Sequence, residues 1–465
     1  MAPAAGFHGS PSRPHMWRTL PHPRRKTASF GWLTVASPPW IRLMRLLAPP
    51  LAGFARLPHA LRSLLRSVRG RVGLSRDTGR ADLRTVARLS TQQLGDRLGL
   101  TVVVGHPDAR ALRPHLSEAV ADWQAQDWDR LGPRLARFDR CRAALPSGER
   151  IAPALSRALF RHIAGPAACT LIDRGRSVPS TDLPEDLFAP LQRILGQQET
   201  DPALHFLAAQ VQLELGWARR GDDYADFALD EALSAAQARF RVARTVLDRI
   251  APRAPHSSHF AELDYRVRAA EGTTEEELTQ AAIRWSRTDT TALAPYALHG
   301  LHLLPRWYGT EGSLRAFADK SWAKTHENMG AAAYAAVYLA ALESDLETAL
   351  TLDLAVFREG LIDMMQLGED PDLTCNAVLR LLWEVSLAPS GIDRREPRAV
   401  RGIRHEMRAL FYDLARHALG PVMPDVWGGR WTEARILHTL AEPFAEELAA
   451  GRTVSIGLQG AMVSE

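Results

Sequence analysis

Cysteine is scarce in this sequence. The 465 residues include three cysteines, which stand far apart and form no Cys-x-x-Cys pair. A disulfide framework needs paired cysteines and a structural zinc site needs closely spaced ones, so the scarcity argues against both. Unpaired thiols fit a reducing compartment, and we expect a cytoplasmic protein. We interpret Cys169 and Cys375 as small core residues, because no cationic side chain adjoins them in the sequence.

Common catalytic and nucleotide-binding motifs are also missing. The sequence has no Gly-x-Ser-x-Gly, no Gly-x-x-x-x-Gly-Lys and no His-Glu-x-x-His motif. Short acidic runs at 222–223, 275–277 and 369–370 fit helix starts and solvated loops better than catalytic carboxylate pairs. We therefore expect no cofactor and no bound metal, and we lean against an enzyme.

Long hydrophobic runs are absent as well. Spanning a bilayer takes about 20 apolar residues, and the best candidates, 27–41 and 329–342, are too short. The first lies in a Pro-rich, basic stretch that fits a disordered tail better than a secretory signal, because its apolar core is interrupted. A start codon at Met16 or Met44 is a further alternative for this stretch.

Acidic residues are almost missing from residues 1–80. This segment holds fourteen arginines or lysines and one acid, a charge of +13, whereas the chain as a whole carries +4, so the remainder carries 4 − 13 = −9. The basic charge thus belongs to a tail, which argues against a specific nucleic-acid-binding fold. Residues 44–71 interleave leucine with arginine, and 59–69 predicts a basic amphipathic helix. It would attach to an anionic membrane surface, though weakly, or to nucleic acid; the alternative is a helix that docks on the acidic body or stays loose.

Helical periodicity dominates the rest of the chain. Apolar residues recur at helical spacing, and glycine or proline separates the segments. The predicted helices include 203–219, 258–271, 275–287 and 372–386. A further helix, Ala331–Leu342, exposes mostly alanine, which lets a neighbour approach closely. Pairs of helices about 35–40 residues long with short links are typical of helical solenoids. We predict an all-α fold of stacked antiparallel helix pairs, a tetratricopeptide-like α-solenoid. The predicted divisions are a basic tail at 1–80, a helical region at 81–195, a repeat domain at 200–450 and a tail at 451–465.

Local patterns predict the structure of four further segments. Residues 345–361 predict the clearest helix, with Leu346, Leu350 and Leu361 on one face. Residues 101–105 are the best strand candidate, although one short strand makes no sheet. Residues 165–184 predict a loop and a possible boundary. The end at 451–465 fits either a loose strand or a disordered tail.

The chain is organised around Leu-Pro-Arg-Trp-Tyr-Gly at 304–309. Pro305 ends a helix over 293–304, Gly309 permits a turn, and a second helix resumes near Ser313, which we expect to cap it. We expect Trp307 to wedge between the two helices. Arg306, Trp307 and Tyr308 have the composition of a binding hot spot; the alternative is a structural corner in which Arg306 bonds helix-end carbonyl groups.

A histidine pair precedes this corner. His299 and His302 lie three residues apart on one helix and would share a face. With a carboxylate they would bind a metal or, with Arg306, form the site of a helical enzyme. A catalytic metal needs at least three protein ligands, and the spacing marks no third, so packing histidines are the better interpretation.

The corner resembles the signature of an uncharacterised bacterial domain-of-unknown-function group. The resemblance rests on Leu-Pro-Arg-Trp-Tyr-Gly at 304–309 and on Phe317–Ala318. It covers about twenty residues closely and 200–450 loosely. It implies a fold related to the tetratricopeptide-like helical repeats and a general interaction role, and it brings no catalytic residues. We therefore expect a scaffold for a protein or peptide partner that binds no specific nucleic acid.

Overall fold

The structure is a computed structural model that describes residues 80–195, 201–221, 230–387, 398–429, 431–457 and 460–464. The predicted disorder of the basic tail and the predicted amphipathic helix at 59–69 lie outside these residues. Membrane contact through 44–71 therefore stays a prediction. Within the described ranges, no helix is long and apolar enough to cross a membrane.

Helices make up most of the described chain. Nineteen α-helices lie in these ranges: α3 Arg80–Val86, α4 Thr91–Arg97, α5 Pro107–Gln124, α6 Trp128–Arg140, α7 Ile151–Asp173, α8 Ala189–Leu195, α9 Pro202–Arg220, α10 Asp230–Ile250, α11 Ser258–Glu271, α12 Glu275–Thr288, α13 Ala294–His302, α14 Ser313–Met329, α15 Ala332–Ser344, α16 Leu354–Leu367, α17 Pro371–Ser386, α18 Arg398–His417, α19 Pro424–Trp427, α20 Glu433–Ala441 and α21 Ala445–Ala449. Short 3-10 helices are η1 Glu185–Phe188, η2 Ala251–Arg253, η3 Leu346–Thr351 and η4 Glu442–Phe444. The prediction of an all-α fold is confirmed.

Local sequence explains several helix starts. Asp201 and Asp370 each cap a helix whose first residue is proline, which lacks the N–H that a first turn leaves unpaired. At α12, the Thr274 hydroxyl accepts from the Glu277 N–H, and the Glu277 side chain accepts from the Thr274 N–H. These caps place the first residues of three helices within one residue of the sequence-based prediction.

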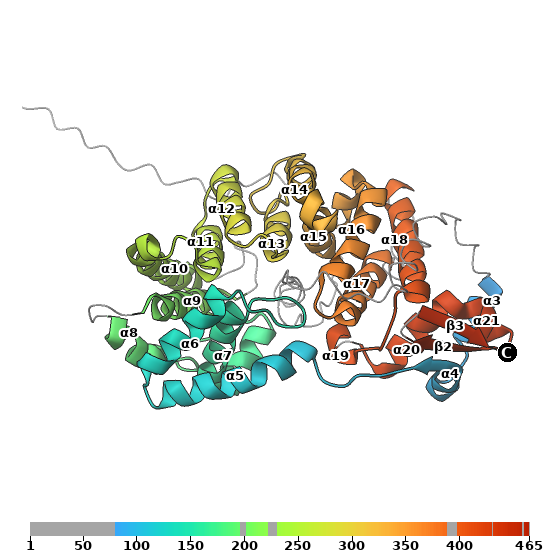
Figure 1. Cartoon of the computed structure of the whole chain (residues 1–465), viewed down its shortest axis with the longest axis horizontal. Coiled ribbons are helices and arrows are strands. Elements are labelled where there is room, and N and C mark those ends of the chain that lie inside the picture. The colour runs from blue at the N-terminus through green and yellow to red at the C-terminus, as the bar shows by residue number, and fades with distance from the viewer. Residues whose placement is uncertain are drawn as a thin grey trace, which may run out of the picture.

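The helices pack as successive antiparallel pairs. Helix α9 packs on α10, α11 on α12, and α17 on α18, as expected for helices that follow one another in the sequence. Figure 1 shows α10 to α18 following one another in a curved row. Helices α5 to α7 lie below one end of the row, and α19 to α21 with the strands lie below the other. This arrangement confirms the prediction of stacked helix pairs in a helical solenoid.

The N-terminal part of the described chain reaches the far end of this row. Helix α3 packs against α21 and α4 against α20, and an Arg97 guanidinium nitrogen donates to the Leu448 carbonyl at 2.9 Å. The Gly105 N–H then donates to Asp425 at 2.7 Å, after which α5 begins at the opposite side. In Figure 1 this loop runs beneath the row, from the group formed by α4 and the strands, past α19, to the start of α5.

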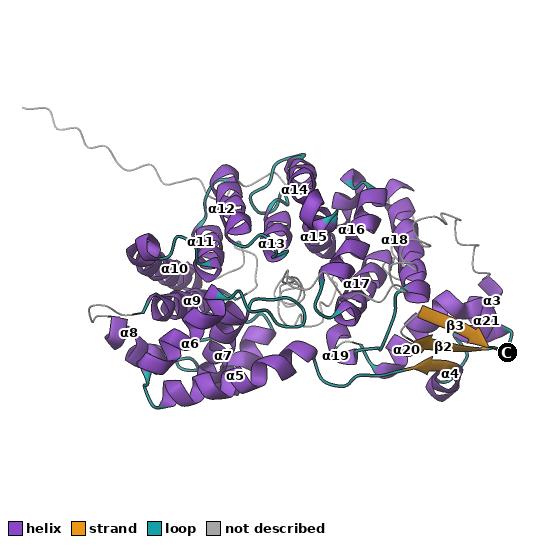
Figure 2. Cartoon of the chain, in the orientation of Figure 1, coloured by secondary structure: helices purple, strands orange, loops and turns teal. Residues whose placement is uncertain are grey.

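A three-stranded sheet sits at the same place (Figure 2). Strand β1 (Leu98–Leu100) pairs in parallel with β2 (Thr453–Gly457), which pairs antiparallel with β3 (Gly460–Ser464). The strand predicted at 101–105 is wrong in its position. The observed strand β1 ends at Leu100, and beyond it Val102 makes a single bridge to Val422. Of the two alternatives for 451–465, the strand is the one observed over β2 and β3.

The predicted helix at 345–361 is wrong. A 3-10 helix ends at Thr351, and α16 begins only at Leu354, capped by Asp353. The Tyr334 hydroxyl accepts the Asp353 N–H at 2.9 Å, and the Tyr338 hydroxyl donates to the Thr351 carbonyl at 3.1 Å. Two tyrosines one turn apart on α15 thus satisfy the backbone where the helix is interrupted, and Leu350 is left 51% exposed.

The predicted loop at 165–184 begins later than expected. Helix α7 continues to Asp173 across a kink at Gly165, where φ is +80°. Only glycine adopts this left-handed backbone without strain, so the Gly165–Pro166 pair bends the helix rather than ending it.

Helix α15 lies at the centre of the row and is buried along its length. Residues 332–342 are all buried, and close approaches at two glycines explain how. A Cβ atom on Gly300 of α13 would lie 2.3 Å from the Val337 carbonyl oxygen, and one on Gly360 of α16 would lie 2.4 Å from the Ala331 carbonyl oxygen. The alanine-rich sequence of α15 lets both neighbours pack against its backbone, as the sequence predicts.

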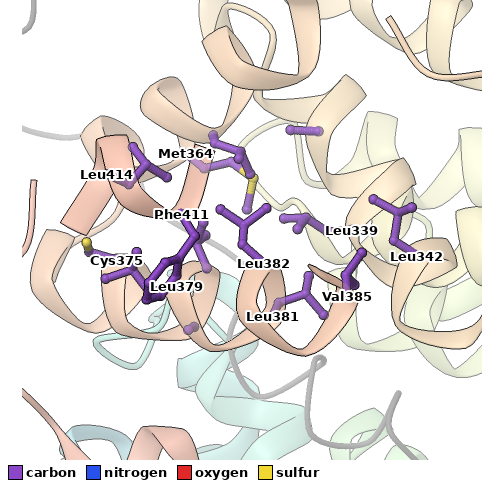
Figure 3. Close-up of a cluster of buried hydrophobic side chains, with 14 of the residues drawn as sticks. Leu339, Leu342, Met364, Cys375, Leu379, Leu381, Leu382, Val385, Phe411 and Leu414 are labelled. Atoms are coloured by element: carbon purple, nitrogen blue, oxygen red, sulfur yellow. The ribbon is translucent and has the colours of Figure 1, made fainter. Parts of the chain in front are cut away.

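Two hydrophobic clusters fill the interior. One spans residues 119–267, and the other joins residues 86–98 to 265–456. Figure 3 shows part of the second, where Leu339 of α15, Met364 of α16, Leu382 of α17 and Phe411 of α18 point toward one another. Cys375 is buried there, as predicted, whereas Cys169 on α7 is only half-buried, so the same prediction is wrong for it. The predicted domain divisions stay a prediction.

Candidate functional site

The predicted corner forms between α13 and α14. Helix α13 ends at His302, and Leu303 and Leu304 turn inward with 2% and 1% of their surface exposed. A Cβ atom on Gly309 would lie 1.8 Å from the Leu303 carbonyl oxygen, so this position needs glycine for its close approach. The cap is shifted from the prediction: Gly312 precedes α14 in a left-handed conformation, and the Ser313 hydroxyl instead accepts the Thr310 N–H at 3.1 Å.

The three predicted binding residues take different positions at this corner. Arg306 is exposed, and it forms no hydrogen bond or ion pair with any residue that the structure describes. Trp307 is 39% exposed, so the wedge role expected for it falls to Leu303 and Leu304. Tyr308 is half-buried and anchors the turn, because its hydroxyl donates to the Ala269 carbonyl at the end of α11. Burial raises the pKa of Tyr308 to about 12, which keeps this donor protonated.

His299 and His302 meet a residue that sequence spacing did not reveal. The Tyr265 hydroxyl of α11 lies 3.1 Å from His299 Nδ1 and 2.8 Å from His302 Nδ1. His299 Nε2 lies 3.0 Å from the Thr279 hydroxyl of α12. The ring of His302 stacks on Tyr265 at 5.6 Å and meets Trp307 edge-on at 6.1 Å. Three helices thus converge on one histidine pair directly beneath the corner.

The electrostatics of this cluster favour neutral histidines. Burial, with a contribution from His302, lowers the pKa of His299 to about 3, and burial, with a contribution from Arg266, lowers that of His302 to about 3. Burial also raises the pKa of Tyr265 well above its ordinary value. No carboxylate among the described residues hydrogen-bonds either ring. An imidazole with a pKa of about 3 is a weak base at pH 7. The helical-enzyme alternative stays a hypothesis.

Metal binding finds no support in the same geometry. Both ring nitrogens of His299 already face a hydroxyl group. Across the described residues, no group of three or more histidines, cysteines or acids is arranged to hold a metal ion. Both rings pack against Tyr265, and the expectation of no bound metal stays a prediction.

A buried ionic network is a second polar feature that the sequence did not indicate. Arg157 of α7 pairs with Glu149 and, at 3.1 Å, with Glu262 of α11. Arg266 lies 2.9 Å from the same Glu262 carboxylate. Burial alone would raise the pKa of Glu262, but these guanidinium groups lower it below its usual range. Such residues are far apart in the sequence and share no spacing, so only the fold shows that they meet.

The loop before α7 joins this network to the next helix pair. Arg150 binds the Asp289 carboxylate with two bonds of 2.6 Å, and Ser258 donates to the same carboxylate at 3.0 Å. Asp108 at the start of α5 accepts the Ser147 N–H at 2.9 Å, and its other oxygen has no partner. Burial raises the pKa of Asp108 to about 7, opposed by the bonds from Ser147 and assisted by nearby carboxylates. Arg150 and Asp289 bond to each other and to neighbouring protein groups. Their arrangement therefore fits a role in holding the loop in place better than a role in binding a ligand.

No family model, no curated protein and no solved structure matches this sequence. The resemblance of the corner to the uncharacterised bacterial group therefore stays a prediction. The structure is that of a helical protein with packed helix pairs, which is compatible with a helical-repeat fold.

Proposed function

We propose that this protein is a bacterial, cytoplasmic helical-repeat scaffold of the tetratricopeptide-like kind. It binds a protein or peptide partner through Arg306, Trp307 and the turn that Tyr308 anchors. It needs no cofactor for this role. Free cysteines at 141, 169 and 375 support the cytoplasmic location.

The observation that carries the proposal is that two large side chains, Arg306 and Trp307, are exposed on a turn that its neighbours hold in place. Arg306 is exposed and Trp307 is 39% exposed, whereas the residues on either side of them are fixed by Gly309 and by the bond from Tyr308 to α11. Arginine and tryptophan are the residues that contribute most to protein interfaces when a partner covers them. A preorganised turn also loses little conformational entropy on binding.

The test compares partner capture by the full chain and by single variants. We expect Trp307→Ala and Arg306→Ala to lose one specific partner that the wild-type chain captures, while folding as the wild type does. Trp322→Ala is the matched control, because Trp322 on neighbouring α14 is 37% exposed. A hot-spot tryptophan contributes about 2–4 kcal/mol, so the Kd for the captured partner should rise by roughly 30-fold or more. A partner retained by both corner variants would refute the proposal.

A further inference from the structure

The hydroxyl and imidazole groups beneath the corner form a chain whose proton positions the geometry dictates. The Thr279 hydroxyl oxygen lies 2.7 Å from the Glu275 carbonyl oxygen of its own helix. A carbonyl oxygen only accepts, so the hydroxyl proton lies between these two atoms. The same hydroxyl oxygen must therefore accept the bond from His299 Nε2 at 3.0 Å. His299 consequently carries its proton on Nε2.

The next two bonds follow from this assignment. A neutral imidazole holds one proton, so Nδ1 of His299 is an acceptor, and the Tyr265 hydroxyl at 3.1 Å donates to it. Tyr265 has then used its proton, and its oxygen accepts the bond at 2.8 Å from His302 Nδ1. His302 therefore carries its proton on Nδ1 and presents a bare Nε2. No described residue donates to that nitrogen, and although most of His302 is buried, Nε2 is not one of the fully enclosed side-chain atoms.

We propose that His302 Nε2 is the hydrogen-bond acceptor of the corner site and that the partner supplies an aromatic N–H or O–H donor beside a carboxylate. This inference rests on the proposed binding function of the corner. The ring of His302 is bordered by the edge-on rings of Trp307 at 6.1 Å and Tyr308 at 5.9 Å. An indole or phenol ring packs favourably against such rings and brings its donor with it. The exposed Arg306 has no ion pair among the described residues, and it suits a carboxylate next to that ring.

The hydrogen-bonded series from Thr279 through His299 and Tyr265 fixes the tautomer of His302 beside the exposed corner. Without it, a neutral histidine would place its proton on either nitrogen and would offer a partner a donor or an acceptor. The Thr279–His299–Tyr265 chain selects one tautomer, so the corner discriminates against a partner group that can only accept. His302 is thus a specificity-determining residue, and Tyr265, His299 and Thr279 are positioning residues.

The first experiment measures the tautomer in the full chain. With ¹⁵N-labelled histidine, two-bond ¹H–¹⁵N spectra distinguish a protonated from a bare ring nitrogen, and His302→Gln identifies the His302 signals. We expect a protonated Nδ1 and a bare Nε2 in the wild type. Thr279→Val should release this preference and mix the tautomers of both histidines. Thr288→Val is the matched control, because Thr288 lies on the same helix and bonds the carbonyl four residues before it at 2.9 Å without touching a histidine. A protonated His302 Nε2 in the wild type would overturn the inference.

The second experiment tests the ligand chemistry with indole and 1-methylindole, which differ in the donor hydrogen. We expect indole to shift the His302 Nε2 signal and to bind the full chain roughly two- to tenfold more tightly, the ratio for one neutral hydrogen bond. Equal effects of the two compounds, or no effect of either, would overturn the donor requirement. The tautomer result is independent of partner capture. A bare Nε2 together with capture unaffected by Trp307→Ala would refute the proposed function and leave the proton assignment standing.

Discussion

Acid should destabilise the fold through His299, and replacing this histidine should remove a calculable part of the effect. The side chain of His299 is 0% exposed, and its pKa is lowered from 6.5 to about 3. In the unfolded chain the ring takes up a proton near pH 6.5, whereas in the folded chain it does not until about pH 3. The stability that depends on neutral His299 is therefore fully present above pH 6.5 and is lost progressively as the pH falls toward 3.

The size of the effect follows from the two pKa values. At pH 5 the ring is protonated in the unfolded state and neutral in the folded state. This pH lies about 1.5 units below the unfolded-state pKa, and each unit corresponds to about 1.4 kcal/mol of unfolding free energy. The free energy of unfolding should thus fall by about 2 kcal/mol between pH 8 and pH 5 on account of His299 alone. Glutamine does not titrate, so the His299→Gln variant should lack this loss, even though its stability at pH 8 is lower.

Urea unfolding at pH 8 and pH 5, followed by tryptophan fluorescence, measures this difference. The quantity of interest is the change in unfolding free energy between the two pH values, compared between wild type and variant. His326→Gln serves as the control, because His326 is exposed; this variant should follow the wild-type pH dependence. The reasoning is refuted if His299→Gln loses as much stability on acidification as the wild type.

Three further variants test other parts of the structure. Asp108→Asn removes a carboxyl whose pKa is raised to about 7. The wild-type fold loses stability as the pH rises from 4 to 7, because the carboxyl ionises more readily in the unfolded chain than in the folded one. The variant lacks this loss and should therefore raise Tm at pH 8 and not at pH 4. Gly300→Ala places a Cβ atom 2.3 Å from the backbone of α15 and should cost about 1–3 kcal/mol, whereas Gly402→Ala on α18, with open space around it, should be neutral or stabilising in the same urea assay. Asn376→Ala removes four hydrogen bonds, two of which satisfy the Met423 N–H and the Trp427 indole N–H, and should cost about 3 kcal/mol or more; the exposed Asn328→Ala variant should change the free energy of unfolding by less than about 0.5 kcal/mol.

Local rules were sufficient where one helix and its caps decide the outcome. The predicted spans 258–271 and 275–287 match α11 and α12 closely, because Ser257, Thr274 and the glycine at 272 mark their ends in the sequence. The Pro-x-x-x-Gly corner after α13 was predictable for the same reason. Close packing against the alanine-rich α15 was also predictable, because small side chains allow a neighbouring helix to approach wherever the helix lies.

Contacts between distant segments decided the rest. The helix predicted at 345–361 is interrupted because hydroxyl groups of Tyr334 and Tyr338 on another helix bind its backbone. The strand β1 exists only because β2, more than 350 residues later, pairs with it. Tyr265 stands 34 residues before His299 on a different helix pair, and no spacing rule links the two. The candidate site was therefore predictable as a corner, while the chain that orients its histidines was not.

Hydrogen exchange of the full chain with and without its captured partner tests the central claim most directly. If the corner is the binding surface, backbone amides of residues 303–312 exchange more slowly in the complex, and the Trp307→Ala chain shows no such protection at the same partner concentration. Amides of α18, remote from the corner in the curved row (Figure 1), keep their exchange rates. Protection of another surface with unchanged exchange at 303–312 would contradict the account.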